Sequence, residues 1–411
     1  MNSSPQLSMV NFNKGAYIIV EGKQKADNFY IIRQGKVRIS KEVEVVEEEG
    51  GNVLGPGDFF GVVSTMSNHS HIETAQALTD VTLISVKRDQ YGVLIEKNAP
   101  IAMKIIEGFS RRMRYLDENL ARLTLKEDSP PGIEHLFHIG EYYARQKQYN
   151  LAHYCYHQYM KFVPQGANVS TARQRLEKIK PYSQAVYLDG DQTEFTREYP
   201  KGTMVFAESM PGQELYIIQK GSVKITKIVN DNEVLLAVLK PGDIFGEMSL
   251  IENKPRSASA VAYEDATLLA VNRENFARMV KSQPQIIARL TTLLAERIWF
   301  IYKQLANTLL TDNVGRLWDA LLIQLEKQRV PIHSGQTHTF DFGPKELVNI
   351  AGLPMDEGNA ALRDVLKSDK VKAVDNRVFV SDVEEVEKQA KYFRKMQRIE
   401  RRRKEAKAHT R

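Results

Sequence analysis

The sequence predicts an α+β protein. Two antiparallel β-roll (jelly-roll-like) domains with flanking helices are joined by a helical hairpin and followed by a C-terminal winged helix-turn-helix. Three observations predict this: an internal repeat of β-type segments, helical periodicity after each copy, and a helix-turn-helix rhythm near the C-terminus. A length of 411 residues suits two to four domains. The predicted segments are 1–125, 130–182, 185–310, 311–384 and 385–411.

Three stretches of the first predicted roll return in the second, 185 to 187 residues later. In each copy, Gly, Pro-Gly-Asp and Asn turns separate short runs of alternating or β-branched residues, which is the spacing of antiparallel hairpins. We therefore expect a small antiparallel roll in each copy. The matching pairs are KGAYIIVEG (14–22) with KGTMVFAES (201–209), FYIIRQGKVRI (29–39) with LYIIQKGSVKI (215–225), and VLGPGDFFG (53–61) with VLKPGDIFG (238–246).

The composition is that of an ordinary globular protein, with 42% hydrophobic and 26% charged residues. The single cysteine, Cys155, excludes an internal disulfide framework, and no apolar run reaches the roughly 18 residues of a membrane span. Because the first residues lack the pattern of a signal peptide, we expect a cytoplasmic protein with no membrane partner. Residues 388–411 hold eleven Lys or Arg and two Glu, a net +9, so the rest of a chain of net charge +6 sums to −3.

The stretch IFGEMSLIENKPRSASA (244–260) in the second copy carries groups that suit a nucleotide. Gly246 permits a sharp turn, and a short helix over EMSLIE would present free N–H groups to an anion. Glu247, when ionised, accepts hydrogen bonds from a pair of donors such as ribose hydroxyls. Arg256 offers a planar fork of donors that matches two phosphate oxygens.

Small residues complete this predicted site. Ser257 and Ser259 add hydroxyl donors, and the small side chain of Ala258 between them takes up little space in the wall of the site. No nucleophile–base pair and no set of metal ligands accompanies these groups. We therefore expect binding without turnover: the protein is not predicted to be an enzyme, and no metal is expected.

The same stretch resembles the phosphate-binding cassette of cyclic nucleotide-binding domains, in which Phe-Gly-Glu is followed by Pro-Arg-Ser-Ala. The resemblance implies that Glu247 takes the ribose 2′-hydroxyl and that Arg256 takes the cyclic phosphate with the help of Ser257. The implied ligand is cAMP or cGMP. The predicted ligand-binding residues are Gly246, Glu247, Met248, Ser249, Arg256, Ser257, Ala258 and Tyr302.

The first copy departs from this pattern. The residues Val62, His71 and Ile72 stand where the second copy has the Glu, the Arg and the first Ser. Valine cannot accept a hydrogen bond, and neutral histidine is a poor partner for phosphate, although His71 would carry charge below about pH 6.5. We expect a closed or self-filled cassette that serves as an interface; a changed ligand preference is the alternative.

Residues 133–180 are helical in pattern and unlike either roll. They resemble one tetratricopeptide helix pair, which must pack on a roll or on a second subunit because a lone repeat cannot bury its apolar face. The residues at that spacing are Gly140, Tyr143, Ala152, Tyr156 and Pro164. Four histidines have spacings that suit a metal, but solvated or stacked side chains are the favoured interpretation. They are His135, His138, His153 and His157.

Residues 283–310 are predicted to form a long helix with an apolar stripe that fits a helix–helix seam. The stripe consists of Ile287, Leu290, Leu294, Ile298, Ile301 and Leu305. This part resembles the catabolite-activator (Crp/Fnr) family, in which the helix implies a homodimer and lays polar residues against the base. Because Ile301-Tyr302 stands where the family has a Thr-Ser pair, Tyr302 is predicted to stack on a purine, and the choice between cAMP and cGMP stays open.

From residue 314 the chain resembles the same family, which implies a winged helix-turn-helix; any small helical domain is the alternative. An amphipathic helix comes first, and the helix-turn-helix turns at Ala351-Gly352. A two-stranded wing is predicted to turn at Asp375-Asn376.

The predicted recognition helix lacks the family's base-reading Glu and Ser-Arg. Asp356, Asn359 and Ala360 stand there instead, and the acidic residues Asp356 and Glu357 disfavour phosphate at the start of the helix. The candidate DNA contacts are Asn359, Arg363 and Lys367. The basic tail 385–411 is predicted to begin as a helix and fray, either attracting phosphates or remaining solvated.

Two functions follow from these observations. The first is a Crp-like DNA-binding transcription regulator, in which a cyclic nucleotide in the second roll reorients the winged helix. The second is a signalling adaptor that binds no DNA and contacts a protein partner through the first roll or the hairpin, as kinase regulatory subunits do. The acidic recognition helix favours the adaptor, and the winged layout and basic tail favour the regulator.

Overall fold

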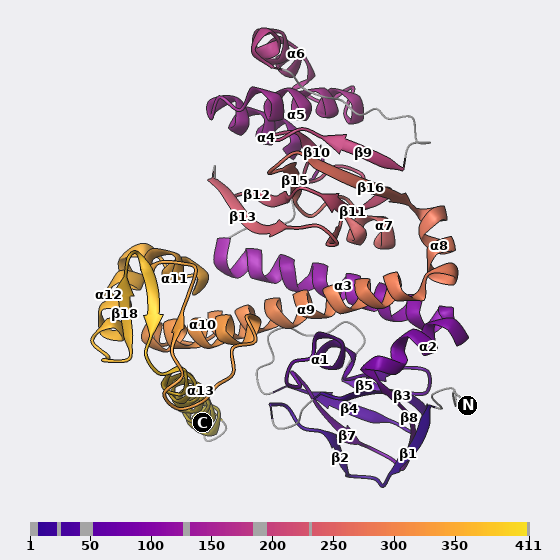
Figure 1. Ribbon diagram of the computed structural model, residues 1–411, viewed down its shortest axis with the longest axis vertical. Helices are drawn as coiled ribbons and strands as arrows, with labels where there is room; N and C mark the ends of the chain where they lie inside the picture. The colour runs from indigo at the N-terminus through magenta and orange to yellow at the C-terminus, as the bar shows by residue number, and fades with distance from the viewer. Residues whose placement is uncertain are drawn as a thin grey trace. The chain divides into compact units, whose positions relative to one another are not determined.

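The computed structural model describes residues 7–22, 26–41, 52–125, 132–183, 195–229 and 232–408. The chain divides into two compact units. Figure 1 labels the helices and strands that they contain. Unit 1 is Met1–Leu7, Lys87–Glu118 and Leu125–Ala295, and unit 2 is Ser8–Val86, Asn119–Thr124 and Glu296–Arg411. Two long helices contribute residues to both units, so the two units do not correspond one to one with the five predicted segments, whose boundaries stay predictions.

Each copy of the repeat forms two four-stranded sheets. The strands of the first roll are β1 Ser8–Phe12, β2 Tyr17–Ile19, β3 Asn28–Gln34, β4 Val37–Ser40, β5 Val53–Leu54, β6 Phe59–Phe60, β7 Thr74–Ala77 and β8 Val81–Lys87. Those of the second are β9 Thr196–Tyr199, β10 Met204–Phe206, β11 Glu214–Lys220, β12 Val223–Val229, β13 Asn232–Leu239, β14 Ile244–Phe245, β15 Ser259–Ala262 and β16 Ala266–Asn272.

The two rolls have the same topology, as the repeat predicts. The sheet orders are β1-β8-β3-β6 and β2-β7-β4-β5 in the first roll, and β9-β16-β11-β14 and β10-β15-β12-β13 in the second. The registers also correspond, since Tyr30 pairs with Phe60 and Tyr216 pairs with Phe245 in antiparallel ladders. Side chains alternate across each sheet, so alternate residues of β8 such as Leu83 are buried in the first core.

Helices follow matching positions in both rolls. They are α1 Val62–Ser67, a 3₁₀ turn Arg88–Gln90, α2 Tyr91–Lys97 and α3 Ala99–Leu125 in the first copy, and α7 Glu247–Glu252, α8 Arg273–Ser282 and α9 Pro284–Thr308 in the second. The Asn272 side chain caps α8 by accepting a hydrogen bond from the backbone N–H of Asn275 at 2.9 Å. On α9, Ile287, Leu294 and Leu305 have no exposed surface in the single chain. Most of the predicted stripe is therefore buried within the chain, and its role as a dimer seam stays a prediction.

The insert between the rolls contains three helices, whereas the sequence predicts a pair. They are α4 His135–Arg145, α5 Tyr149–Phe162 and α6 Val169–Ile179, followed by a 3₁₀ turn Lys180–Tyr182. Their apolar faces share a core with Met204 and Val261 of the second roll, and the Tyr154 hydroxyl donates to the Val205 carbonyl at 3.3 Å. Within unit 1, Figure 1 shows these helices on one side of the second roll and α3 on the other. The insert therefore packs on a roll, and the third helix distinguishes it from a simple tetratricopeptide pair.

The C-terminal part of unit 2 contains the helices and the two-stranded hairpin that the sequence predicts, together with one strand that it does not predict. It consists of α10 Asn313–Lys327, β17 His338–Thr339, α11 Pro344–Ile350, α12 Met355–Leu366, β18 Val371–Val374, β19 Arg377–Val380 and α13 Val383–Ala408. Asp375 and Asn376 have φ of 47° and 57° and form the predicted turn between β18 and β19, because these residue types tolerate the left-handed region better than most. A third strand, β17, pairs with β19 and has no counterpart in the predicted two-stranded wing.

The first turns of the basic tail pack against the folded domain. In the core, Ala390 is fully buried, and Phe393 packs against the same cluster. Arg394 Nε donates to Asp319 Oδ1 at 2.5 Å, and Asp319 is 1% exposed. The predicted boundary at 384 lies at the start of α13, Val383–Ala408, so the tail begins as a helix, as expected, and its first turns pack against the domain.

Candidate functional site

A glycine turn begins the helix of the second cassette. Gly246 has φ of +75°, and α7 starts at the next residue, as predicted. This left-handed conformation favours glycine. A Cβ at Gly246 would also lie 2.6 Å from Arg256 Nη1, closer than real Cβ contacts allow. Backbone and arginine therefore meet here because residue 246 has no side chain.

Arg256 is buried beside this turn and is 6% exposed. Its Nη1 donates to the Gly246 carbonyl at 2.6 Å and to Ser249 Oγ at 2.5 Å, while Nη2 donates to the Glu214 carbonyl at 2.8 Å. Its Nε has no hydrogen-bond partner among the described residues. Burial lowers the pKa of Arg256, and Tyr216 is the largest of the opposing influences. A buried guanidinium with a spare donor is equipped to bind an anion.

Two aromatic rings and a second glycine enclose the guanidinium. Its central carbon lies 4.0 Å from the centre of the Phe206 ring and 5.8 Å from that of Tyr216, within the range of cation–π attraction. A Cβ on Gly212 would come within 2.4 Å of Arg256 Nε and of Ser249 Oγ. The site therefore holds one planar cation against aromatic rings and leaves room for nothing larger than glycine at residue 212.

The other predicted ligand residues of the cassette lie around the same turn. Glu247 is 2% exposed, and Met248 and Ala258 are both 8% exposed. Ser249 bonds the arginine directly, and Ser257 Oγ lies 4.0 Å from Met248 Sδ. All predicted ligand residues except Tyr302 thus belong to unit 1.

Tyr302 belongs to unit 2. It is 3% exposed, and Lys41 Nζ of the first roll is 5.5 Å from the centre of its ring. Its stacking on a purine stays a prediction.

The equivalent turn in the first roll is occupied by the chain's own carboxylate. Gly61 has φ of +78° and precedes α1, as Gly246 precedes α7. Its N–H donates to Glu73 Oε1 at 2.8 Å. Glu73 stands where the second roll has Ala258, so a side chain of the protein takes an amide that an anionic ligand would otherwise use.

In the first cassette, the three residues that stand in place of the predicted ligand contacts of the second cassette are all buried. Val62 is 2%, His71 is 4% and Ile72 is 1% exposed. Burial lowers the pKa of His71, although Glu73 and Asp27 act in the opposite direction. His71 therefore stays neutral to lower pH than an ordinary histidine, which makes it a still poorer phosphate partner than its sequence suggests.

Helix α9 contacts the first cassette within unit 2. The Trp299 Nε1–H donates to the Ser70 carbonyl at 3.2 Å, and the Trp299 ring stacks on His69 with centres 4.0 Å apart. Burial, assisted by the charges of Arg329 and Lys303, lowers the pKa of His69 to about 4. A neutral histidine stacked on an indole thus holds this loop against the helix.

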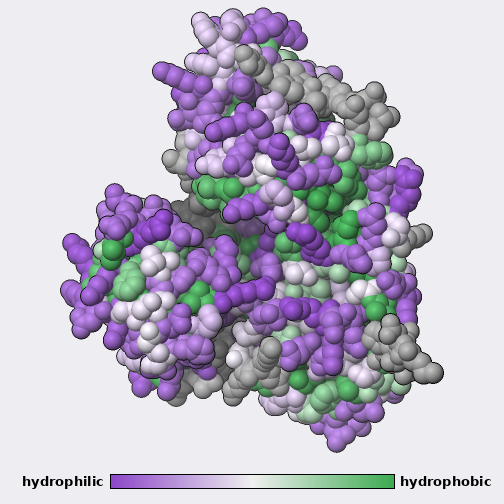
Figure 2. Space-filling model, in the orientation of Figure 1, coloured by the Kyte–Doolittle hydropathy of each residue, from purple (hydrophilic) through white to green (hydrophobic). Residues whose placement is uncertain are grey.

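Two of the candidate DNA contacts lie on one face of α12, and the third, Lys367, directly follows its last residue. Asn359, Arg363 and Lys367 follow one another at intervals of four residues, and all three are exposed. Asp356 and Glu357 in the first turn are exposed as well. Figure 2 shows a mostly hydrophilic surface in the region of α11 and α12. The helix thus presents acidic groups at its start and basic groups toward its end.

The sequence did not predict that the rings of Phe206 and Tyr216 pack against Arg256. It also did not predict the contacts that residues outside the cassette make with it. A comparison of the two copies could have identified Phe206. The first copy, which lacks the arginine, also lacks this aromatic residue and has Ile19 at the matching position. Gly212 had no signal of its own. Arg114 of α3, which contacts the cassette, lies 138 residues before its partner Glu252 and could not be assigned by spacing.

Among the residues that the structure describes, no group of three or more His, Cys, Asp or Glu could hold a metal ion. No helix in the described ranges is long and apolar enough to cross a membrane.

The sequence matches the cyclic nucleotide-binding domain twice, over residues 9–98 and 196–283. It is 30% identical over 195 residues to the "CRP-like cAMP-activated global transcriptional regulator" of Mycobacterium tuberculosis, covering 47% of this chain and 87% of that protein. It is 42% identical over 103 residues to the "Cyclic AMP receptor protein" of Thermus thermophilus, covering 25% of this chain and 48% of that protein.

A relative of another kind matches a shorter part of the chain. The "cAMP-dependent protein kinase regulatory subunit" of Aspergillus niger is 33% identical over 114 residues, which covers 28% of this chain and 26% of that protein. The relatives thus include a transcriptional regulator and a kinase subunit.

Proposed function

Since this chain belongs to the family of cyclic nucleotide-binding-domain proteins that includes the Crp-like regulators, we propose that it is a DNA-binding regulator controlled by a cyclic nucleotide in its second roll. The proposed ligand is cAMP, with cGMP as the alternative, because the names of its relatives refer to cAMP. Glu247 would accept from the ribose 2′-hydroxyl, and Arg256 with Ser257 would hold the cyclic phosphate.

The observation that carries this proposal is the buried guanidinium of Arg256. It bonds two backbone carbonyls and the Ser249 hydroxyl, and its Nε has no partner among the described residues. Carbonyls are weaker partners for a cation than a phosphate oxyanion. A cyclic phosphate would therefore compete well for this fork and draw Arg256 away from Gly246 and Glu214. That exchange would shift the cassette relative to the rest of the roll.

The proposed output is a winged helix-turn-helix built from α10 to α12 and the sheet of β17 to β19. Asn359 and Arg363 on the exposed face of α12, with Lys367 directly after its last residue, would approach DNA, and exposed basic residues of α13 such as Lys395 and Arg398 would add sequence-independent attraction to phosphates. Ligand binding would change the population of two helix arrangements and so re-aim this domain.

The acidic start of α12 favours a second function, that of a cyclic nucleotide-dependent adaptor. Asp356 and Glu357 are exposed in the first turn, where they would repel DNA phosphates. The similarity to a kinase regulatory subunit over 114 residues supports the same alternative. In that case the first roll or the helices α4 to α6 would contact a protein.

An electrophoretic shift assay on pooled genomic fragments separates the two functions. Retarded fragments that appear with cAMP or cGMP and disappear in the Arg256→Ala variant would support the regulator. Cyclic nucleotide binding without any retarded fragment at low salt would support the adaptor. Absence of both activities would refute the two proposals together.

A further inference from the structure

We propose that Arg114, on helix α3, is a positioning residue for the cyclic nucleotide site and links that site to the helix that follows the first roll. The inference rests on the proposed function of the second roll, and it adds a residue that lies outside the cassette. Four observations carry it: the contacts of Arg114, its burial, the place of those contacts in the cassette, and their recurrence in the first roll.

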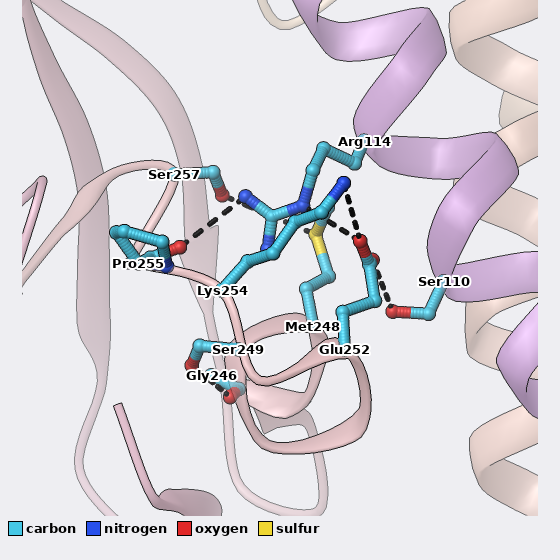
Figure 3. A network of polar contacts seen from close by, with 9 residues as sticks. All are labelled: Ser110, Arg114, Gly246, Met248, Ser249, Glu252, Lys254, Pro255 and Ser257. Carbon is cyan, nitrogen blue, oxygen red and sulfur yellow. Dashed lines mark hydrogen bonds and ion pairs between the residues drawn. The ribbon is translucent and has the colours of Figure 1, made fainter. Parts of the chain in front are cut away.

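Arg114 contacts the cassette at two points, both within unit 1 (Figure 3). Its Nε donates to Glu252 Oε2 at 2.9 Å, and its Nη1 donates to the Pro255 carbonyl at 3.2 Å. Ser110, one turn earlier on α3, donates its hydroxyl to Glu252 Oε1 at 2.8 Å. Both oxygens of one carboxylate are therefore held by one face of α3.

This contact is buried, unlike an ordinary surface ion pair. The Arg114 and Glu252 side chains are 9% and 4% exposed, and Ser110 is fully buried. Lys254 also lies near the carboxylate, with Nζ 3.6 Å from Oε2, but its side chain is 58% exposed. Exposed pairs contribute little to stability, whereas breaking a buried pair leaves an uncompensated charge. Of the two cations near Glu252, Arg114 is therefore the one whose loss would leave the buried carboxylate without its ionic partner.

The two contact points lie at the two ends of the segment that joins α7 to Arg256. Glu252 is the last residue of α7, and Pro255 immediately precedes Arg256. The guanidinium of Arg114 thus holds both ends of the short link between the cassette helix and Arg256. In addition, its buried Nη2 has no hydrogen-bond partner among the described residues. Any shift of this link on ligand binding must change the contacts of α3.

The same carbonyl is contacted in the first roll. Ser70 stands one residue before His71, as Pro255 stands one residue before Arg256. Its carbonyl accepts a hydrogen bond from Trp299 on α9 within unit 2. In each copy, a helix that follows the other roll in sequence therefore donates to the carbonyl before the phosphate-binding position. This recurrence distinguishes the Arg114 contact from an incidental surface interaction.

The consequence is a linkage between the nucleotide and helix α3. If Arg114 stabilises the link in the geometry that binds nucleotide, its loss must weaken binding, and nucleotide must in return stabilise the contact with α3. Couplings of this kind change affinity by about 5- to 150-fold. We expect the Arg114→Ala variant to fall in this range, with Arg256→Ala losing more because it removes the phosphate partner itself.

Calorimetric titration of the full chain with cAMP and with cGMP tests this inference. The variants are Arg114→Ala, Arg114→Lys and Glu252→Gln, with Arg111→Ala as the matched control, because Arg111 lies on the same helix and is exposed. Lysine keeps the charge but lacks the planar fork that reaches both Glu252 and Pro255, so partial rescue is expected. Hydrogen exchange of α3 amides between 107 and 118, with and without nucleotide, gives the second readout. Thermal unfolding identifies any variant that fails to fold.

The expected result is weaker binding for all three variants, unchanged binding for the control, and nucleotide-dependent protection of α3 that Arg114→Ala abolishes. If folded Arg114→Ala and Glu252→Gln bind as tightly as the control while Arg256→Ala loses binding, the positioning role is overturned and the proposed function survives. If the unmodified protein binds neither nucleotide, both are refuted.

Discussion

Replacing Arg256 by alanine is expected to remove most of the affinity for cAMP. The guanidinium is 6% exposed, packs 4.0 Å from the centre of the Phe206 ring, and donates to the Gly246 and Glu214 carbonyls. A ligand phosphate bound there is removed from water together with its partner. Deleting one member of such a buried pair costs roughly 3–5 kcal/mol, which raises the dissociation constant by about two to three and a half orders of magnitude.

Isothermal titration calorimetry of the full chain measures this change directly. Arg256→Lys keeps the charge without the fork and should bind with intermediate affinity. Arg278→Ala is the matched control, since Arg278 lies on α8 of the same unit and is exposed. Thermal unfolding of each variant separates lost binding from lost folding. Equal affinities for a folded Arg256→Ala variant and the control would refute the assignment of this arginine to the phosphate.

Three further predictions concern unit 2. Because the folded pKa of His69 is about 4, below the ordinary 6.5, protonation favours the unfolded state. Stability should therefore fall between pH 7 and pH 5 by at most about 2 kcal/mol, and by less to the extent that solvent screens this partly buried ring. His69→Gln should abolish that part of the fall in urea unfolding, and identical pH profiles would contradict the pKa. Truncation after Val386 should unfold the C-terminal domain, seen as a missing thermal transition, because it removes packed residues of α13; an intact transition would contradict the packing. Replacing Lys395, Arg398 and Arg403, all exposed, by glutamine should spare folding and flatten the salt dependence of DNA binding by about 0.9 for each phosphate that α13 no longer neutralises. An unchanged slope would exclude the tail from DNA binding.

The repeat made the rolls predictable from sequence. Matching turns and β-branched runs specify the same hairpins twice, and the two copies indeed share sheet order and register. The Gly246 turn and the helix after it were predictable from local sequence. Glycine readily adopts a positive φ, and the residues EMSLIE that follow it have helical character. The turn at Asp375-Asn376 was predictable for the same reason. These features depend on local chemistry that a short stretch of sequence contains.

Features that depend on distant contacts were not predictable. The stripe on α9 predicts an apolar face, but periodicity does not indicate what that face packs against. Residues such as Leu294 are buried within the chain, and the dimer seam stays a prediction. The charge of the tail leaves phosphate attraction and a solvated segment both open, and it does not indicate that Phe393 and Arg394 pack into the domain. Arg114 resembles any basic residue on a long helix. In each case the missing information is which surface lies opposite.

The stoichiometry of cAMP binding tests whether the second roll binds a cyclic nucleotide and the first does not. One roll has a buried arginine with a spare donor, and the other has a carboxylate, Glu73, on the equivalent turn. Calorimetry of the full chain should therefore give one cyclic nucleotide per chain, and none in the Arg256→Ala variant at the same concentrations. Two equivalents, with the second retained in that variant, would contradict the account of the first roll. A saturating signal unaffected by Arg256→Ala would contradict the account of the second.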